Sequence, residues 1–313
     1  MNSKLLMATM ITLSAISAAS CCNQGKVPAI DTANLDTSVA PGEDFYAYAT
    51  GGWQKSHPLK PEYSRYGSFD ILAENNEIRL NDLFRSLASA KTEEGSTERK
   101  IADLYNMGLD SLRLNEEGIS PVLPYVNELE SVVDAGSFAV ATANCAKFGI
   151  GSIYGIYVTS DMVDCNSQVL YLGESGLAMG NRDYYLLPEH QALRDGYRAF
   201  LEKIFTLAGY ENAAEIASDA FDVEMAIAVP YWSMVQQRDV QAQYNPMSSA
   251  ELFAAYPDLC LDVYFKTLGI PEQSKLIVEE PSYFEAVDAI VKDIDPAKLR
   301  HYLQASVLSE ACG

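Results

Sequence analysis

Apolar residues recur at helical spacing along most of the chain after residue 68. Over residues 69–88 they follow the three- and four-residue repeat of one helix face. Local capping signals predict the first residues of three further helices: Ser120-Pro121, the Ser248–Glu251 capping box and Asp295-Pro296. One further helix is predicted to hold Ile101, Leu104, Tyr105 and Leu112. Three more are predicted over 190–208, which ends before Gly209, over 213–229 and over 282–292.

Two stretches have a different pattern. Residues 152–161 and 168–173 are rich in Ile, Tyr and Val and predict two strands of a hairpin, and Ile277-Val278 predicts a short third strand. The chain is therefore predicted to be mainly α, a large multi-helix domain with a small β-hairpin element.

The last predicted helix carries an apolar stripe close to the end of the chain. No later element follows on which this stripe would pack, and both a truncation and a natural C-terminus stay open as interpretations. The stripe consists of Leu299, Tyr302, Leu303, Val307 and Leu308.

The first residues resemble a bacterial secretion signal. Residues 1–20 join a short basic start to an apolar run that is too short to span a membrane stably. Small residues then lead into Cys21, as in the lipobox of bacterial lipoproteins, where the cysteine is acylated. We expect a signal peptide at 1–20, a lipid-anchored tether at 21–38 and location in the bacterial cell envelope. A plain signal peptide, with release to the periplasm, is the alternative.

Composition narrows the class of protein. The 313 residues are 48% hydrophobic, enough for a sizeable core, and the net charge of −21 opposes binding to nucleic acid, which needs basic patches. The cysteines beyond the tether show no C-x-x-C spacing and predict neither a disulfide framework nor a zinc knuckle. Cys145 and Cys260 are expected to be small buried hydrophobes, and a Cys145–Cys165 disulfide is left open.

Complete catalytic motifs are missing from the chain. None of its three histidines, His57, His190 and His301, begins an H-E-x-x-H zinc motif, and neither a G-x-S-x-G elbow nor a P-loop occurs. Adjacent glutamates such as Glu279-Glu280 are interpreted as solvated surface. We therefore expect no catalytic residues and no metal ligands within these residues.

The segment 41–70 has no clean repeat. Phe45, Tyr46, Tyr48 and Trp53 crowd a short stretch that ends in Gly51-Gly52, a turn signal, and composition alone predicts an aromatic lock on a helical domain.

Four stretches in order resemble the N-terminal region of the neprilysin family of zinc metalloendopeptidases, which includes bacterial oligopeptidases. Together they span the chain from about Val39 onward. They are 44–53 (D-F-Y through G-G-W), 64–70 (S-R-Y-G-S-F-D), 181–186 (N-R-D-Y-Y-L) and 238–246 (R-D leading to Y-N-P).

The resemblance implies a two-domain enzyme in which a helical N-terminal domain caps a thermolysin-like zinc domain and admits only short peptides. The zinc motif of the family lies later in the chain, so residues 39–313 correspond to the cap, and zinc belongs to the complete enzyme. Thr50 stands where animal members usually have a cysteine, so their first disulfide is absent, as in bacterial relatives.

One binding site of the family falls within these residues. Arg65 matches the arginine that binds the C-terminal carboxylate of a peptide, and a guanidinium can hold both carboxylate oxygens. Asp70 would orient Arg65 or shape the neighbouring subsite. Residues 181–186 are expected to carry packing or a domain contact.

The resulting prediction is the N-terminal part of a zinc oligopeptidase, inactive alone, whose partners are a peptide substrate and a C-terminal catalytic domain. The alternative is a non-catalytic envelope lipoprotein that binds peptides or a protein partner.

Overall fold

The computed structural model describes residues 30–61 and 63–311, which form two compact units. The first unit ends at Asp110 and the second begins at Ser111. The predicted signal peptide, the Cys21 anchor and the start of the tether lie outside the described residues, as does Cys312.

The first unit begins with a close packing of short elements. η1 (Thr32–Asn34) lies against α2 (Phe45–Ser56), whose first turn is capped by the carboxylate of Asp44. The predicted turn at Gly51-Gly52 is wrong, because both glycines lie inside α2. A Cβ atom at Gly52 would clash with the backbone of η1, so glycine here permits close packing.

Two longer helices complete the first unit. α3 (Ser68–Ser89) confirms the predicted helix and packs against α4 (Thr97–Leu109). The described residues cover the apolar face predicted for α3 only in part: Phe84 packs against Tyr105 of α4, whereas the exposed fraction of Leu72 is 63% and that of Ile78 is 59%.

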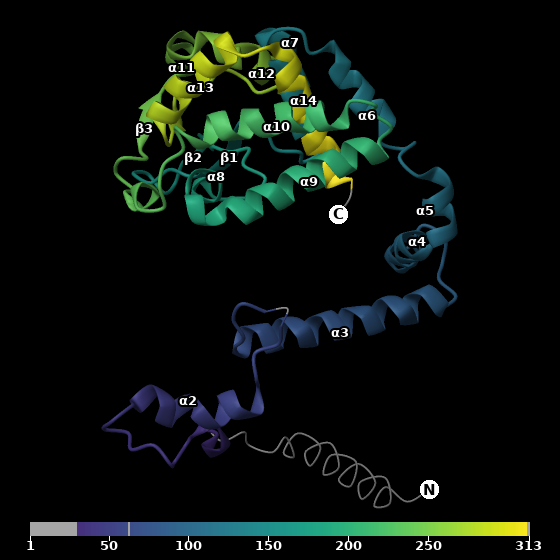
Figure 1. The fold of residues 1–313 in the computed structure, drawn as a ribbon, viewed down its shortest axis with the longest axis vertical. Helices are drawn as coiled ribbons and strands as arrows, with labels where there is room; N and C mark the ends of the chain where they lie inside the picture. Colours follow the sequence, from purple (N-terminus) through teal and green to yellow (C-terminus); the bar gives the residue numbers. More distant parts are fainter. Residues whose placement is uncertain (1–29, 62, 312–313) are drawn as a thin grey trace, which may run out of the picture. The chain divides into compact units, whose positions relative to one another are not determined.

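The second unit is a set of helices around a small sheet (Figure 1). α10 lies centrally and packs against both α9 and α14, and α7 packs against α12. Its α-helices are α5 (Ser111–Glu117), α6 (Leu123–Glu128), α7 (Ala135–Ala146), α8 (Arg182–Leu186), α9 (Gln191–Leu207), α10 (Ala213–Ala228), α11 (Ser249–Ala255), α12 (Leu261–Leu268), α13 (Pro281–Asp293) and α14 (Pro296–Glu310). Its short 3-10 helices are η2 (Leu129–Ser131), η3 (Pro188–His190), η4 (Gln236–Arg238) and η5 (Pro257–Leu259).

The sheet has the strand order β1-β2-β4-β3. β1 (Tyr154–Ser160) and β2 (Gln168–Glu174) form the predicted antiparallel hairpin, and β4 (Leu276–Val278) pairs parallel to β2. β3 (Asn245–Met247), which the sequence did not predict, is antiparallel to β4 at the edge, a position that tolerates Pro246. The mainly α fold is thus confirmed, with four strands where a hairpin and one short strand were predicted.

The apolar stripe of α14 is buried by elements that precede it in the chain. Leu299, Tyr302, Leu303, Val307 and Leu308 are each at most 4% exposed, and α14 contacts α10, α9 and α7. The expectation that the stripe needs a later partner is therefore wrong, because the helix folds back onto earlier ones.

Two local predictions also need correction. α6 begins at Leu123 without a side-chain cap, so Ser120 does not start it. Leu112 belongs to the separate helix α5.

The cysteines of the described residues are free thiols. Cys145 is buried, as predicted, and no disulfide joins it to Cys165. Cys260 is only partly buried, against the prediction, and adopts a left-handed conformation (φ 48°) where η5 ends and α12 begins. Within residues 30–61 and 63–311, no helix is both long and apolar enough to span a membrane.

Candidate functional site

A cavity in the first unit lies between α2 and the segment that leads into α3. Its volume is about 700 Å³, and Arg65 is one of the residues that line it. The lining residues are Asn34, Tyr46, Ala49, Thr50, Trp53, Gln54, His57, Leu59, Arg65, Tyr66, Gly67 and Ser68.

Stacked rings form one wall of this cavity, which we call the aromatic wall: His57, Trp53 and Tyr66. Trp53 and His57 lie one helical turn apart, so their rings stack with centroids separated by 4.6 Å. Tyr66 stacks on the indole at 6.2 Å, and Tyr63 packs beside Tyr66 at 5.3 Å. These contacts fix the segment before α3 against the end of α2.

A charged pair supports the aromatic wall from α3. The Glu74 carboxylate accepts hydrogen bonds from Lys60 Nζ (2.5 Å) and from the Tyr66 hydroxyl (2.6 Å). These donors lower the pKa of Glu74 to about 2, and the Lys60 ammonium lies 5.2 Å from the centre of the Tyr66 ring. The carboxylate is therefore ionised at neutral pH and holds both partners.

The Arg65 side chain is exposed at this cavity. Its guanidinium forms no hydrogen bond or ion pair with residues 30–61 or 63–311, so its donors are available for a ligand. A free guanidinium beside aromatic rings can hold a carboxylate by two parallel hydrogen bonds.

Asp70 lies in the first turn of α3. Its Oδ2 accepts a hydrogen bond of 2.7 Å from the Gly67 backbone N–H, which caps the helix and fixes the chain two residues after Arg65. Within the part of the chain that the structure describes, the two side chains form no direct hydrogen bond or ion pair. The role of Asp70 beside Arg65 remains a prediction.

The motif at residues 181–186 lies within the second unit, in and just before α8. Asn181 caps α8 by accepting from the Asp183 N–H (2.9 Å), and Arg182 Nη1 donates to the Tyr231 carbonyl (2.6 Å). Tyr185 is buried and donates a hydrogen bond to Glu224 on α10. The motif therefore packs α8 onto α10 and onto the loop that follows it.

Glu224 is a carboxylate buried in the second unit, 2% exposed. Besides Tyr185, it accepts hydrogen bonds from the Tyr197 hydroxyl (2.6 Å) and the Ala178 N–H (3.2 Å). No described cation forms an ion pair with it, and burial raises its pKa above the ordinary value. The three donors satisfy a group that would otherwise be costly to bury.

The three histidines lie in unrelated surroundings. His57 stacks on Trp53, His190 packs edge-on against Tyr184, and His301 Nδ1 lies 2.9 Å from Asp219 Oδ2. Among the described residues, no group of histidine, cysteine, aspartate or glutamate side chains is arranged to hold a metal ion. Residues 30–61 and 63–311 therefore do not fit zinc.

The sequence singled out Arg65 as a candidate site residue, but it did not indicate the residues that build the cavity around it. Trp53 was assigned to an aromatic lock, and its four-residue spacing from His57 was the available signal for the stack. Lys60 and Glu74 are fourteen positions apart, so their pairing has no sequence signature.

Comparison with known proteins places the chain in a family of peptidases. A family model described as peptidase family M13 matches residues 41–313. Endothelin-converting enzyme 1 of Homo sapiens is 26% identical over 284 residues, with 86% of this chain and 36% of that protein covered. Endothelin-converting enzyme 1 of Cavia porcellus is also 26% identical, and the matched region covers 37% of that protein. The chain therefore spans little more than a third of the length of these relatives.

Solved structures share the fold. The zinc metalloprotease Zmp1 of Mycobacterium tuberculosis, in complex with an inhibitor, has a TM-score of 0.81 at 22% identity, over 89% of this chain and 43% of that one. PepO from Lactobacillus rhamnosis has a TM-score of 0.65 at 18% identity, over 87% and 43% of the two chains.

Proposed function

The chain belongs to peptidase family M13 and corresponds to the N-terminal region of its neprilysin-like members, and from this we propose that it supplies the substrate-binding cap of a zinc metalloendopeptidase. The complete enzyme would hydrolyse short peptides. This chain would limit their size and bind their C-terminal carboxylate.

The observation that carries the proposal is the Arg65 guanidinium, exposed and unpaired within the described residues at a cavity of about 700 Å³. A carboxylate held by two charge-assisted hydrogen bonds fixes both the position and the direction of a peptide. The aromatic wall offers apolar surface next to that anchor. A peptide bound in this way would keep its end at a fixed distance from the peptide bond to be cleaved.

Two carboxylates keep Arg65 in place without contacting a ligand. Asp70 holds the Gly67 N–H, and Glu74 holds Tyr66, the residue after Arg65. We assign both as positioning residues. The chemistry of peptide hydrolysis is left to the catalytic domain of the complete enzyme, since the residues described here do not fit zinc.

A pair of peptides tests the proposal. The two peptides share one sequence and differ only in a free C-terminal carboxylate or an amide, and their dissociation constants are measured with the gene product read to its stop codon. We expect Arg65→Met to weaken binding of the free acid by about ten- to a hundredfold, the loss of a charge-assisted bidentate pair, and to change binding of the amide much less.

Arg85→Met is the matched control, because Arg85 is an exposed arginine on α3 outside the cavity. It should leave the affinity for both peptides unchanged. An equal loss of affinity for acid and amide in Arg65→Met would exclude the carboxylate role.

A further inference from the structure

Strand β1 forms one open edge of the sheet in the second unit. We propose that this edge binds an extended peptide as an added strand, and that Glu279 selects a peptide with basic side chains. A peptide ligand is also part of the function proposed above, and it rests on membership of a peptidase family. The site itself does not use Arg65.

The outward backbone groups of β1 have no partner within the described residues. In the strand order β1-β2-β4-β3, β1 pairs with β2 on one side only. No described residue outside β2 forms a hydrogen bond with the backbone of residues 154–159. An antiparallel strand directs about half of its N–H and C=O groups to each side. The complement of such an edge is another extended chain.

β1 also lacks the features that usually protect an exposed edge. Such strands are typically short, bulged, or interrupted by proline or lysine. β3, the opposite edge of the sheet, has three residues and contains Pro246. β1 has seven residues without a charged side chain or a proline. Its pairing with β2 runs without a bulge from Tyr154 opposite Glu174 to Ser160 opposite Gln168, so the edge is regular along its whole length.

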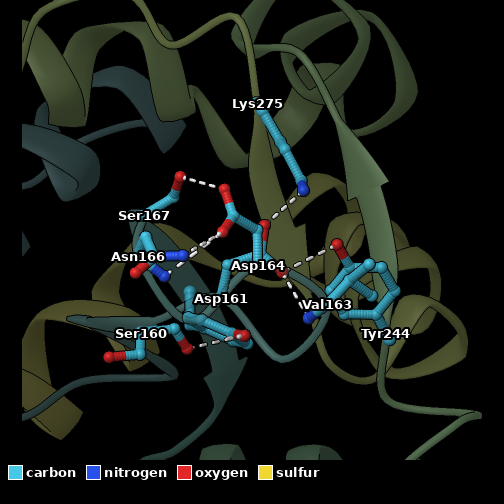
Figure 2. Close-up of polar contacts among 9 residues, drawn as sticks. Ser160, Asp161, Val163, Asp164, Asn166, Ser167, Tyr244 and Lys275 are labelled. Atoms are coloured by element: carbon cyan, nitrogen blue, oxygen red, sulfur yellow. Dashed lines mark hydrogen bonds and ion pairs between the residues drawn. The ribbon is translucent and has the colours of Figure 1, made fainter.

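The turn after β1 holds the strand in a fixed position. Asp161 accepts a hydrogen bond from the Tyr244 hydroxyl at 2.9 Å and pairs with Lys275 (Figure 2). Asp164 closes the turn by accepting from the Ser167 hydroxyl at 2.6 Å. A preformed edge loses less conformational entropy on binding than a flexible segment would.

A cavity of about 270 Å³ lies at the start of β1. Residues 154–156 of β1 line it together with the end of α7 and with Tyr264 and Leu268 of α12. Beyond the cavity the strand is exposed, and the exposed fraction of Val158 is 63%. Side chains alternate between the two faces of a strand, so every second side chain of an added strand would lie next to Ile156 and Val158. These positions favour apolar residues in the peptide.

On the other face, the carboxylate of Glu279 lies beside the hairpin. The adjacent pair Glu279-Glu280 is not the solvated surface that the sequence suggested, because Glu280 is 3% exposed and Glu279 is partly buried. Glu279 accepts from the Tyr157 hydroxyl on β1 at 2.7 Å and forms no ion pair with a described cation. Gly155 and Gly173 lie opposite each other, and a Cβ atom at Gly173 would be 2.5 Å from Glu279 Oε2. The carboxylate thus occupies the place of a side chain on β2.

A basic side chain on an added strand would be directed toward this carboxylate. Neighbouring strands lie about 4.8 Å apart, so the added strand would lie about 10 Å from β2. A long side chain opposite Gly155 crosses β1 where no side chain blocks its path. Arginine or lysine at this position would supply the cation that Glu279 lacks.

Charge also favours a basic peptide over a second copy of this chain. The sequence has a net charge of −21, so two copies that approach edge to edge repel each other. The same charge attracts a peptide that carries arginine or lysine. The ligand of the β1 edge is therefore an extended peptide in which basic and apolar residues alternate.

Amide hydrogen exchange with capped peptides tests the proposal. The probe is an octapeptide of alternating arginine and valine, acetylated and amidated so that it offers Arg65 no carboxylate. Its counterpart has glutamate in place of arginine. In the 313-residue chain, we expect the arginine peptide to slow exchange at 154–160 and to leave 245–247, at the opposite edge, unchanged. The glutamate peptide should protect neither segment.

Glu279→Gln removes the charge and keeps an acceptor for the Tyr157 hydroxyl. It should weaken binding of the arginine peptide by about fivefold, the effect of one partly exposed ion pair. Glu189→Gln is the matched control, because Glu189 is an exposed glutamate in η3 of the same unit, and it should leave the affinity unchanged. The comparison of the two peptides uses the parent chain, so it decides the question even if Glu279→Gln does not fold.

Several results would overturn the proposal. They are equal exchange at 154–160 with and without the arginine peptide, equal protection of 154–160 and 245–247, equal protection by both peptides, or an unchanged affinity in Glu279→Gln. Protection of 154–160 that rises with protein concentration in the absence of peptide would assign the edge to a second copy instead. None of these results bears on Arg65, because the capped peptides have no free C-terminal carboxylate.

Discussion

At the scale of single residues, the surroundings of each carboxylate decide its role. Glu74 has an ammonium and a phenol as donors and its pKa is lowered, whereas Glu224 is buried without a cation and its pKa is raised. Nothing in the local sequence distinguishes the two, because their partners come from other elements. The same holds for Arg65, whose free guanidinium is significant only because the described residues leave it unpaired at a cavity.

The buried network around Glu224 makes a prediction at this scale. Tyr197→Phe removes one of its three donors and leaves a buried carboxylate oxygen with less compensation, so we expect the free energy of unfolding to fall by about 1 to 2 kcal/mol. Chemical denaturation monitored by circular dichroism measures this change. Tyr125→Phe, at an exposed tyrosine on α6, should change stability by less than about 0.5 kcal/mol, and equal effects of the two variants would show that the hydrogen bond contributes little.

At the scale of elements, two helix starts with local signals were predicted correctly, whereas the Ser120-Pro121 start was not. The Ser248–Glu251 capping box opens α11, and Asp295 caps α14 by accepting from the Ala297 N–H. Both depend on residues within one turn, so the sequence contains all the information. Gly209, with φ at +89°, follows the end of α9 for the same local reason.

Elements that depend on distant partners were missed or misinterpreted. β3 is three residues long and exists because it pairs with β4, and the Gly51-Gly52 pair stays helical because η1 approaches it closely. The stripe of α14 seemed to lack a partner only because the helices that cover it come earlier in the chain. These features are set by tertiary contacts, which periodicity does not contain.

The corrected role of α14 gives a prediction. Leu303 is fully buried among earlier helices, so Leu303→Ala should lower the free energy of unfolding by about 2 to 5 kcal/mol through lost burial and a new cavity. Urea denaturation measures the effect. Leu207→Ala on α9, where leucine is 69% exposed, is the control and should cost far less, and a similarly small loss at Leu303 would mean that the stripe is not packed as described.

At the scale of the whole molecule, the chain is a family M13 segment that spans little more than a third of its relatives' length. Its described residues offer a helical body, a cavity lined by Arg65, for which we propose carboxylate binding, and no group arranged to hold a metal. Our central claim is therefore that substrate binding and peptide hydrolysis are divided between this segment and a catalytic domain.

Zinc-dependent cleavage of a short peptide tests this claim most directly. The gene product read to its stop codon and the 313-residue chain alone are assayed side by side, each with zinc and with a chelator. On our proposal, the gene product read to its stop codon cleaves the peptide and loses activity with the chelator, while the chain alone is inactive under both conditions. Zinc-dependent cleavage by the 313-residue chain alone would contradict the account.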